Sequence, residues 1–430
     1  MKRRLLPILM TLVLVCALPI WAAFVTSGDV TNPLVSTAGA SELNLQGMID
    51  HANAGATITL NSNTEIAATL QIKKDLTLDL NGHVLKMTGD GSVLYVKKDG
   101  PNTVTLTITD SRPQNPHTGS YADLPAGGVI TGGKGPNVTG IYYDYVGGAV
   151  FLEKDTTLKL EGGTLTVNSG SSIYIDGATL VMSGGTITGK TVGVHNNVGT
   201  FTMTGGRITG CSERGVYVYN GNMTMSGTAY IGGNPGARED IYVREPVHKH
   251  TDLSVTGGTV EGNVRIEFGA NLGMTQESLK PVANSVVKEG GVFEGHIQVR
   301  IDNTEGTSVD YNTVNFIDEV AKTRTLQLVL ADKKATRPTD PATVNGQAFM
   351  YWAKEGASEE WDFDAEINES ITLYAVRTPA SSGGYYYYPT TDTKADDAKG
   401  SPKTADPGVA LYAALSILSL TGLTCTAKKR

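Results

Sequence analysis

Five short segments of the chain carry side chains that could contact one ligand together. In each segment a ring follows a β-branched residue, and the rings form a column made by Phe151, Tyr174, His195, Tyr217 and Tyr242. Two residues further along, a neighbouring column contains Glu153, Asp176, Asn197, Tyr219 and Arg244. Alternate residues of a strand point to the same side, so both columns are expected to point away from the core.

A row of rings beside carboxylates, amides and a guanidinium is a surface suited to sugars. Aromatic rings pack against pyranose faces, and carboxylates and amides hydrogen-bond to sugar hydroxyls. The alternative is structural, because aromatic side chains on adjacent strands also stabilise a sheet by packing on one another. The inward-pointing Asn196 is expected to form a hydrogen-bonded ladder rather than to bind a ligand.

Catalysis is the third possibility for this surface. Glu153 and Asp176 lie on adjacent segments and could share Ca²⁺, as carboxylates of calcium-dependent lyases do. Such a lyase also needs a basic residue, and none stands out among Lys154, Lys190, Arg207, Arg214 and Arg244. His248 and His250 are spaced like metal ligands but lack a third partner. We therefore expect no cofactor, and we favour binding over catalysis.

Glycine spacing predicts the elements that hold these side chains. Glycine makes up 51 of 430 residues, which is more than the usual ~7 %, and a repeated strand–glycine pattern has its first glycines at Gly162, Gly184, Gly205 and Gly227. Weaker copies contain Gly82, Gly257 and Gly290. Apolar residues alternate within each copy, which is typical of a strand with one buried face. Short strands recurring at this interval predict an all-β solenoid with one coil per repeat.

The repeat resembles the right-handed parallel β-helix of the pectate-lyase-like superfamily over roughly residues 55–305. The resemblance implies a fold but no single activity, because adhesins, lyases and glycosidases share this scaffold. An exposed solenoid end needs a cap. We expect that cap in a leader covering residues 24–54, as a helix over about Glu42–Ala52 with Ser41 as N-cap.

A different unit is predicted over residues 311–377, with strands around Thr313–Phe316, Thr325–Leu330 and Ile371–Val376. It resembles the internalin-type B repeat, a small β-grasp-like module of Gram-positive surface proteins. The resemblance implies that Trp352 and Phe363 contribute to its core. Residues 378–400, which include the unexplained Tyr385–Tyr388, have no apolar periodicity and predict a flexible linker.

Both ends of the chain resemble protein-targeting signals. Residues 1–23 combine basic residues with an apolar run, as a secretory signal peptide does, although an uncleaved anchor is the alternative. Residues 401–430 combine a Ser-Pro-Lys-Thr-Ala motif, an uncharged span over Gly408–Ala427 that predicts a transmembrane segment, and a basic end. They resemble the sorting signal of sortase substrates. Pro402 and Thr404 match its Pro-x-Thr core, whereas Ala405 stands where glycine is usual. The resemblance implies an extracellular protein that a sortase joins to peptidoglycan; a simple membrane anchor is the alternative.

Net charge and cysteine content exclude some kinds of partner and of covalent cross-link. The chain carries a formal net charge of −8, which becomes −13 once residues 1–23 and 405–430 are removed. This charge argues against nucleic acid as a partner. Cys211 is the one cysteine left between the two ends, so no intrachain disulfide is expected. The sequence thus predicts a wall-anchored adhesin that binds host or dietary glycans, with a wall-tethered lyase or glycosidase and a structural spacer as alternatives.

Overall fold

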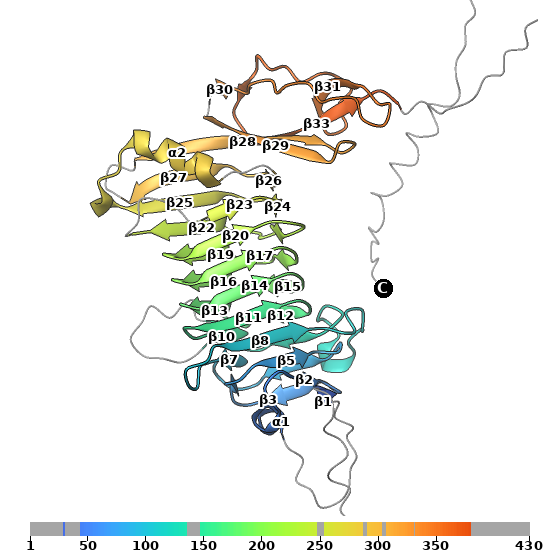
Figure 1. The fold of residues 1–430 in the computed structure, drawn as a ribbon, viewed down its shortest axis with the longest axis vertical. Helices are drawn as coiled ribbons and strands as arrows, with labels where there is room; N and C mark the ends of the chain where they lie inside the picture. Colours follow the sequence, from blue (N-terminus) through green and yellow to red (C-terminus); the bar gives the residue numbers. More distant parts are fainter. Residues whose placement is uncertain are drawn as a thin grey trace, which may run out of the picture. The chain divides into compact units, whose positions relative to one another are not determined.

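The computed structural model describes residues 29–30, 44–135, 147–246, 253–286, 290–302, 307–330 and 332–379. Through most of these residues the chain forms successive coils that stack on one another, as in a β-solenoid (Figure 1). The strands of the stacked coils form three parallel sheets, here called sheets A, B and C. One coil crosses sheet C in β13 (Ser171–Asp176), sheet A in β14 (Thr179–Met182) and sheet B in β15 (Thr186–Thr188). The predicted β-solenoid is therefore confirmed.

Each sheet adds one strand per coil. Besides β14, sheet A contains β1 (Asp29–Val30), β2 (Ala56–Thr59), β5 (Leu76–Asp79), β8 (Val104–Thr109), β11 (Thr156–Leu160), β17 (Thr200–Met203), β20 (Asn222–Met225) and β23 (Leu253–Val255). Besides β15, sheet B contains β3 (Thr64–Ile66), β6 (Val84–Met87), β9 (Val129–Thr131), β12 (Thr164–Thr166), β18 (Arg207–Ile208), β21 (Tyr230–Ile231), β24 (Gly258–Val260) and β26 (Gly291–Phe293). Besides β13, the parallel part of sheet C contains β4 (Leu70–Ile72), β7 (Leu94–Val96), β10 (Val150–Leu152), β16 (Val192–Asn197), β19 (Arg214–Tyr219), β22 (Glu239–Glu245), β25 (Val264–Gly269) and β27 (Ile297–Asp302).

The core lies between the three sheets and consists of stacked side chains from equivalent positions. In sheet A the register places Leu158, Leu180, Phe201 and Met223 in one row, and all four are buried. The alternating apolar residues of the repeat therefore form the inner faces of the strands. Burying such side chains provides roughly 1.5–3 kcal/mol each, so the core is the main source of stability.

Paired glycines make the bend between sheets A and B. Gly185 and Gly206, the second glycines of successive pairs, have φ angles of +73° and +79°. The coils touch through the backbone here, because the Arg207 N–H donates to the Gly185 carbonyl at 3.0 Å. A Cβ at Gly206 would lie 2.6 Å from the Gly184 carbonyl oxygen. The glycine period thus reflects both backbone conformation and coil spacing.

Gly206→Ala is expected to lower the free energy of unfolding by about 2 kcal/mol, because it combines left-handed backbone strain with a steric clash. Gly236 is the matched control, since its φ is +83° but a Cβ there would meet nothing closer than 3.7 Å. Urea unfolding followed by circular dichroism should show the larger loss for Gly206→Ala. Equal losses would mean that the close approach of the coils is unimportant.

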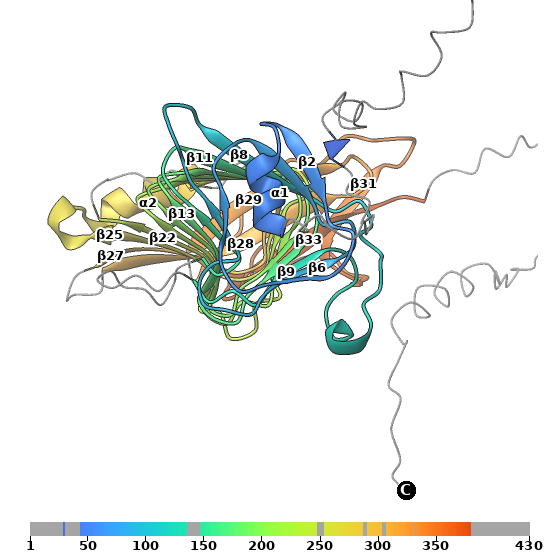
Figure 2. The ribbon, with the colours of Figure 1, turned by 90° about the horizontal axis from the view of Figure 1, so that it is seen from below.

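Two helices flank the coils. Helix α1 (Leu45–His51) lies over the first coils (Figure 2), with Leu45 and Ile49 in the core. Its N-cap is Asn44, whose side chain accepts from the Gly47 N–H at 2.8 Å, rather than the expected Ser41. The described helix therefore begins three residues after the expected start, because the Asn44 side chain caps one N–H of its first turn.

Helix α2 (Gln276–Val286) packs against β27 and was not predicted. Its Pro281 has the sequence character of a helix breaker. The buried residues Leu279, Val282 and Val286 nevertheless have helical spacing, so periodicity was the signal that could have revealed it. The short helices η1 (Gly119–Tyr121) and η3 (Ala270–Leu272) lie in connections between strands.

Sheet C continues beyond the coils. The long strand β28 (Ser308–Asp318) pairs antiparallel with β27 and with β29 (Thr323–Leu330), and parallel with β33 (Ile371–Arg377). Strand β31 (Phe349–Lys354) joins β33, and β30 (Lys333–Lys334) pairs with β32 (Glu366–Ile367). The ring of Phe316 packs against Trp352 at 5.1 Å and against Phe363 at 6.3 Å between ring centroids. Trp352 is therefore part of the core, as predicted, and Phe363 is partly buried and packs against it.

Candidate functional site

The aromatic column exists on the outer face of sheet C. The strand register pairs each predicted ring with the ring on the next coil, in the order Phe151, Tyr174, His195, Tyr217 and Tyr242. Tyr95 extends the column by one coil because it pairs with Phe151. Parallel in-register stacking therefore brings together residues that lie more than twenty positions apart in sequence.

The rings of the column pack on one another. Phe151 and Tyr174 are stacked at 5.4 Å between centroids with an interplanar angle of 12°, and Tyr217 and Tyr242 at 5.1 Å with 10°. His195 lies between the two pairs, 4.8 Å from Tyr174 and 4.7 Å from Tyr217. The column was expected to be exposed, yet the exposed fractions of His195 and Tyr242 are only 9 % and 8 %. Mutual stacking covers the ring faces, so a ligand would meet mainly ring edges and hydroxyls.

The second column also lies in register, through Asp176, Asn197, Tyr219 and Arg244. Asn197 Nδ2 donates to Asp176 Oδ1 at 3.0 Å, which holds these two polar groups side by side. Glu153 directly follows β10 and acts on Tyr95 of the first column: burial, reinforced by the Glu153 carboxylate, raises the pKa of the Tyr95 phenol. Each of these polar groups is half-buried. The second column therefore presents hydrogen-bonding groups that are held in place rather than free to rotate.

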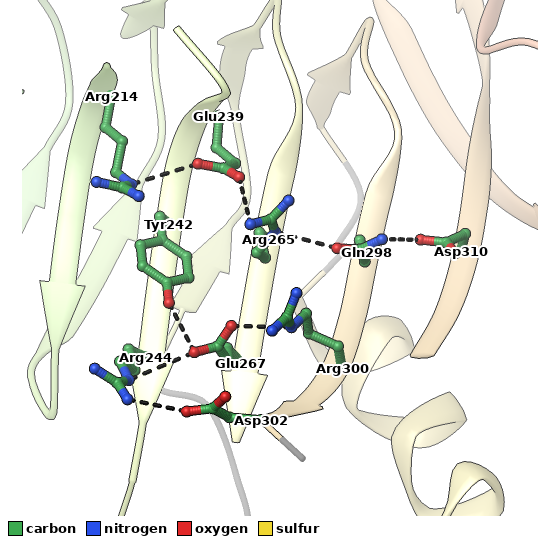
Figure 3. A network of polar contacts seen from close by, with 10 residues as sticks. All are labelled: Arg214, Glu239, Tyr242, Arg244, Arg265, Glu267, Gln298, Arg300, Asp302 and Asp310. Atoms are coloured by element: carbon green, nitrogen blue, oxygen red, sulfur yellow. Dashed lines mark hydrogen bonds and ion pairs between the residues drawn. The ribbon is translucent and has the colours of Figure 1, made fainter. Parts of the chain in front are cut away.

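Beyond Tyr242 the ring column gives way to charged residues (Figure 3). The buried Glu239 carboxylate lies 2.9 Å from Arg265 Nη1 and 3.4 Å from Arg214 Nε. Arg265 Nε donates to Gln298 Oε1 at 3.1 Å, and Gln298 Nε2 donates to Asp310 at 2.6 Å. This row runs across four neighbouring strands of sheet C, from β22 to β28, with Arg214 on β19 at its start.

A second row lies beside the first and centres on Glu267 (Figure 3). Tyr242 Oη donates to Glu267 Oε1 at 2.9 Å, and Arg300 Nε lies 2.9 Å from Oε2. Arg244 Nε is 3.5 Å from Glu267, and its Nη2 donates to Asp302 at 3.0 Å. Arg244 thus serves the predicted column and this network together. Because carboxylates and guanidiniums alternate, the network neutralises its own charge.

Burial sets the protonation of the rings. Desolvation, helped by the nearby Arg214 charge, lowers the pKa of His195 to about 4, so its imidazole is neutral at physiological pH. Desolvation likewise raises the pKa values of Tyr217 and Tyr242, and the Glu267 carboxylate adds to the effect at Tyr242. The column therefore presents neutral rings and protonated phenols.

Sequence reasoning missed the charged half of this surface. Its members include Arg214, Glu239, Arg265, Glu267, Arg300 and Asp302. The signal was present, because Val264-Arg265-Ile266-Glu267 and Ile297-Gln298-Val299-Arg300 alternate like the earlier coils and pair in register with them. The outward residues of these coils are charged or polar instead of aromatic, so a pattern defined by rings does not include them.

Asn196 behaves as predicted. It is fully buried, and its Nδ2 donates to the carbonyls of Gly199 at 3.1 Å and Asn222 at 2.9 Å, while its Oδ1 accepts from the Gly199 N–H. The side chain therefore joins two coils at the turn between sheets C and A. Satisfied on both its oxygen and its nitrogen, it has a structural role.

Several predicted features lie outside the described residues. They are the signal peptide, His248, His250, the Tyr385–Tyr388 cluster, and the sorting residues Pro402, Thr404 and Ala405. Within the described ranges, no three His, Cys, Asp or Glu side chains gather as they would around a metal ion. None of the described helices combines the length and apolar character needed to cross a bilayer.

Comparison of the chain with protein-family models, with curated proteins and with solved structures found no match.

Proposed function

We propose that this protein is a cell-wall-anchored adhesin that recognises glycans on the outer face of sheet C. The observation that carries the proposal is the in-register pair of columns, in which phenols and rings lie beside Asp176, Asn197 and other polar groups. Sugars need this combination, because apolar C–H faces and hydroxyl groups occur in the same ring.

The periodicity of the coils favours a linear glycan. Each coil presents similar groups about 4.8 Å beyond the previous one. An extended polysaccharide running along the column would meet the Tyr174 and Tyr217 hydroxyls and the Asp176–Asn197 pair on successive coils. Because the ring faces are covered by stacking, contact would be made through ring edges and hydrogen bonds. Host or dietary glycans are the proposed ligands.

The proposed location rests on the ends of the chain. We infer a right-handed β-helix of the pectate-lyase-like type followed by a B-repeat-like spacer over residues 311–377. A linker and a sorting signal follow this spacer, and a sortase would join Thr404 of the signal to peptidoglycan. This arrangement would hold the coils away from the wall, where soluble or cell-bound glycans are accessible.

Binding is tested by changing hydroxyls and rings separately. On a glycan array, Tyr174→Phe/Tyr217→Phe is expected to weaken binding about tenfold, because hydrogen bonds to sugars are lost while ring stacking is kept. Tyr174→Ala/Tyr217→Ala should abolish binding. Tyr121→Ala, a tyrosine on the loop before β9, is the control and should bind like the wild type.

Unchanged binding by both double variants would defeat the glycan proposal and leave the structural spacer. A lyase is the other alternative, and it predicts unsaturated uronide products from pectin or glycosaminoglycans. Absorbance of those products with the wild-type chain would replace binding by catalysis as the function of this face.

A further inference from the structure

A pocket of about 400 Å³ lies on the sheet B side of the solenoid, away from the ring column of sheet C. Its lining contains Arg207, Thr228, Tyr230, Thr259 and Arg324, together with Ala229 and backbone of Gly227, Gly258 and Gly290. We propose that this pocket binds a tetrahedral oxyanion ester, the sulfate or phosphate group of a glycan.

Arg207 and Tyr230 line the pocket from adjacent strands of sheet B. They are register partners on β18 and β21, and the Arg207 guanidinium carbon lies 3.9 Å from the centroid of the Tyr230 ring. The ring is itself fixed, because the Tyr230 hydroxyl donates to Glu261. Burial, strengthened by Glu261, raises the pKa of Tyr230 to about 12, so this hydrogen bond persists at physiological pH. The Arg207 guanidinium is therefore held over a fixed ring by a cation–π contact.

Arg324 supplies a second positive charge from β29, a strand far from Arg207 in sequence. Its own carboxylate contact is weak: Nη2 lies 3.9 Å from Glu319 Oε1, and both side chains are exposed. Among the described residues, no carboxylate forms an ion pair with Arg207 and none lines the pocket. Two guanidiniums thus face one cavity in a chain of net charge −8.

The charge of this cavity differs from that of a second pocket on the same side of the solenoid. A neighbouring pocket of about 470 Å³, at the turn from sheet B to sheet C, has the opposite character because Asp240 and Glu261 line it. The Tyr230 hydroxyl of the first pocket donates to Glu261 of the second. An anionic group would be repelled from the acidic pocket and attracted to the one with Arg207 and Arg324.

The donor set favours a tetrahedral group over a planar carboxylate. One guanidinium can satisfy both oxygens of a carboxylate in a fork-to-fork pair. Here two guanidiniums from different strands are combined with the hydroxyls of Thr228 and Thr259. A sulfate or phosphate ester has three terminal oxygens pointing in different directions, and these can accept from several sides at once.

That the oxyanion is carried by a glycan rests on the proposed function, so the test separates the two. Isothermal titration uses four oligosaccharides of equal length, which are sulfated, phosphorylated, uronate-containing and neutral, and also inorganic sulfate. The wild-type chain is expected to bind the sulfated or the phosphorylated form most tightly, and the stronger of the two identifies the ester. Affinity should fall with ionic strength.

Arginine variants test whether the oxyanion binds in this pocket. Arg207→Gln and Arg324→Gln should each weaken that binding about tenfold, because each removes charge-assisted hydrogen bonds. Arg207→Lys should weaken it severalfold, since lysine keeps the charge but loses the planar stacking on Tyr230. Arg238→Gln removes an exposed arginine that lies outside the pocket, and it should have no effect.

Three results would overturn the inference: equal losses in Arg238→Gln and Arg207→Gln, a uronate ligand that binds as tightly as the esters, or binding of inorganic sulfate only. Loss of binding in the Tyr174→Ala/Tyr217→Ala chain but not in the arginine variants would support glycan recognition by sheet C while excluding this pocket. The opposite pattern would support the pocket alone.

Discussion

Asp318→Ala is expected to lower the free energy of unfolding of the C-terminal strands by about 3–5 kcal/mol. Asp318 and Arg377 join the end of β28 to the end of β33, and only 1 % and 2 % of their side chains are exposed. Arg377 Nε lies 3.1 Å and 3.2 Å from the two carboxylate oxygens, and its other nitrogens donate to the carbonyls of Gln347 and Ala342. Removing the carboxylate leaves a buried guanidinium with an uncompensated charge.

The measurement is urea unfolding followed by tryptophan fluorescence, because Trp352 lies in the core of these strands and Trp361 packs against that core. Glu369→Ala is the matched control, since its ion pair with Lys354 is exposed and contributes at most about 1 kcal/mol. The double variant Asp318→Ala/Arg377→Met should be less destabilised than Asp318→Ala alone. A double variant as unstable as the sum of both single changes would contradict the charge argument.

The same pair predicts a response to acid. Burial alone would raise the pKa of Asp318, but hydrogen bonds from Arg377 and from the Ala321 and Val320 N–H groups, with the Arg377 charge, hold it below its usual value. A carboxyl with a lowered folded-state pKa stabilises the fold above its unfolded-state pKa of about 3.9. This contribution is therefore full at neutral pH and is lost as the pH falls through the folded-state value.

His195→Phe is expected to reduce, by about 3 kcal/mol, the loss in free energy of unfolding that occurs between pH 6.5 and pH 4. The pKa of His195 is about 4 in the folded chain because the ring is desolvated and lies near Arg214, whereas an unfolded histidine has a pKa of about 6.5. Between these values the unfolded chain binds more protons than the folded chain. Stability contributed by the neutral ring is thus present above pH 6.5 and is lost as the pH falls to about 4.

The measurement compares urea unfolding of wild type and His195→Phe at several pH values from 7 to 4, followed by circular dichroism. Phenylalanine preserves ring packing against Tyr174 and Tyr217 but cannot titrate. Tyr217→Phe is the control, because it changes the same column and its phenol, whose pKa burial raises, does not titrate in acid. Parallel pH profiles for wild type and His195→Phe would show that His195 does not take up the proton.

The ring column was predictable because parallel coils translate sequence period into contact. Once Gly184 and Gly205 are aligned, Tyr174 and His195 must occupy equivalent positions on neighbouring strands. The burial of His195 was not predictable in this way. It depends on the volumes of the two rings that enclose it, and alternation shows only that the side chain points outward.

The network around Glu239 and Glu267 could likewise be predicted only in part from the sequence. The outward position of Glu267 follows from the alternating pattern, whereas Glu239 lies three residues before Tyr242 and does not follow from it. Their partners Arg265 and Arg300 come from later coils of different composition. Similarly, Ser41 was the expected N-cap because serine favours that position, yet Asn44 accepts the hydrogen bond from Gly47. The sequence pattern predicted that a helix forms here, but the hydrogen bond made by Asn44 determines where the helix begins.

By itself, the sequence determined the coiled parallel sheets, the glycine bends and the register of both columns, because each follows from a repeat of near-constant length. Only the tertiary structure decided which of those outward residues are buried, and that β29 brings Arg324 to the same pocket as Arg207 and Tyr230. The physical reason is that repeat length fixes neighbours between successive coils. Contacts with strands outside the repeat depend on how the chain folds back after it.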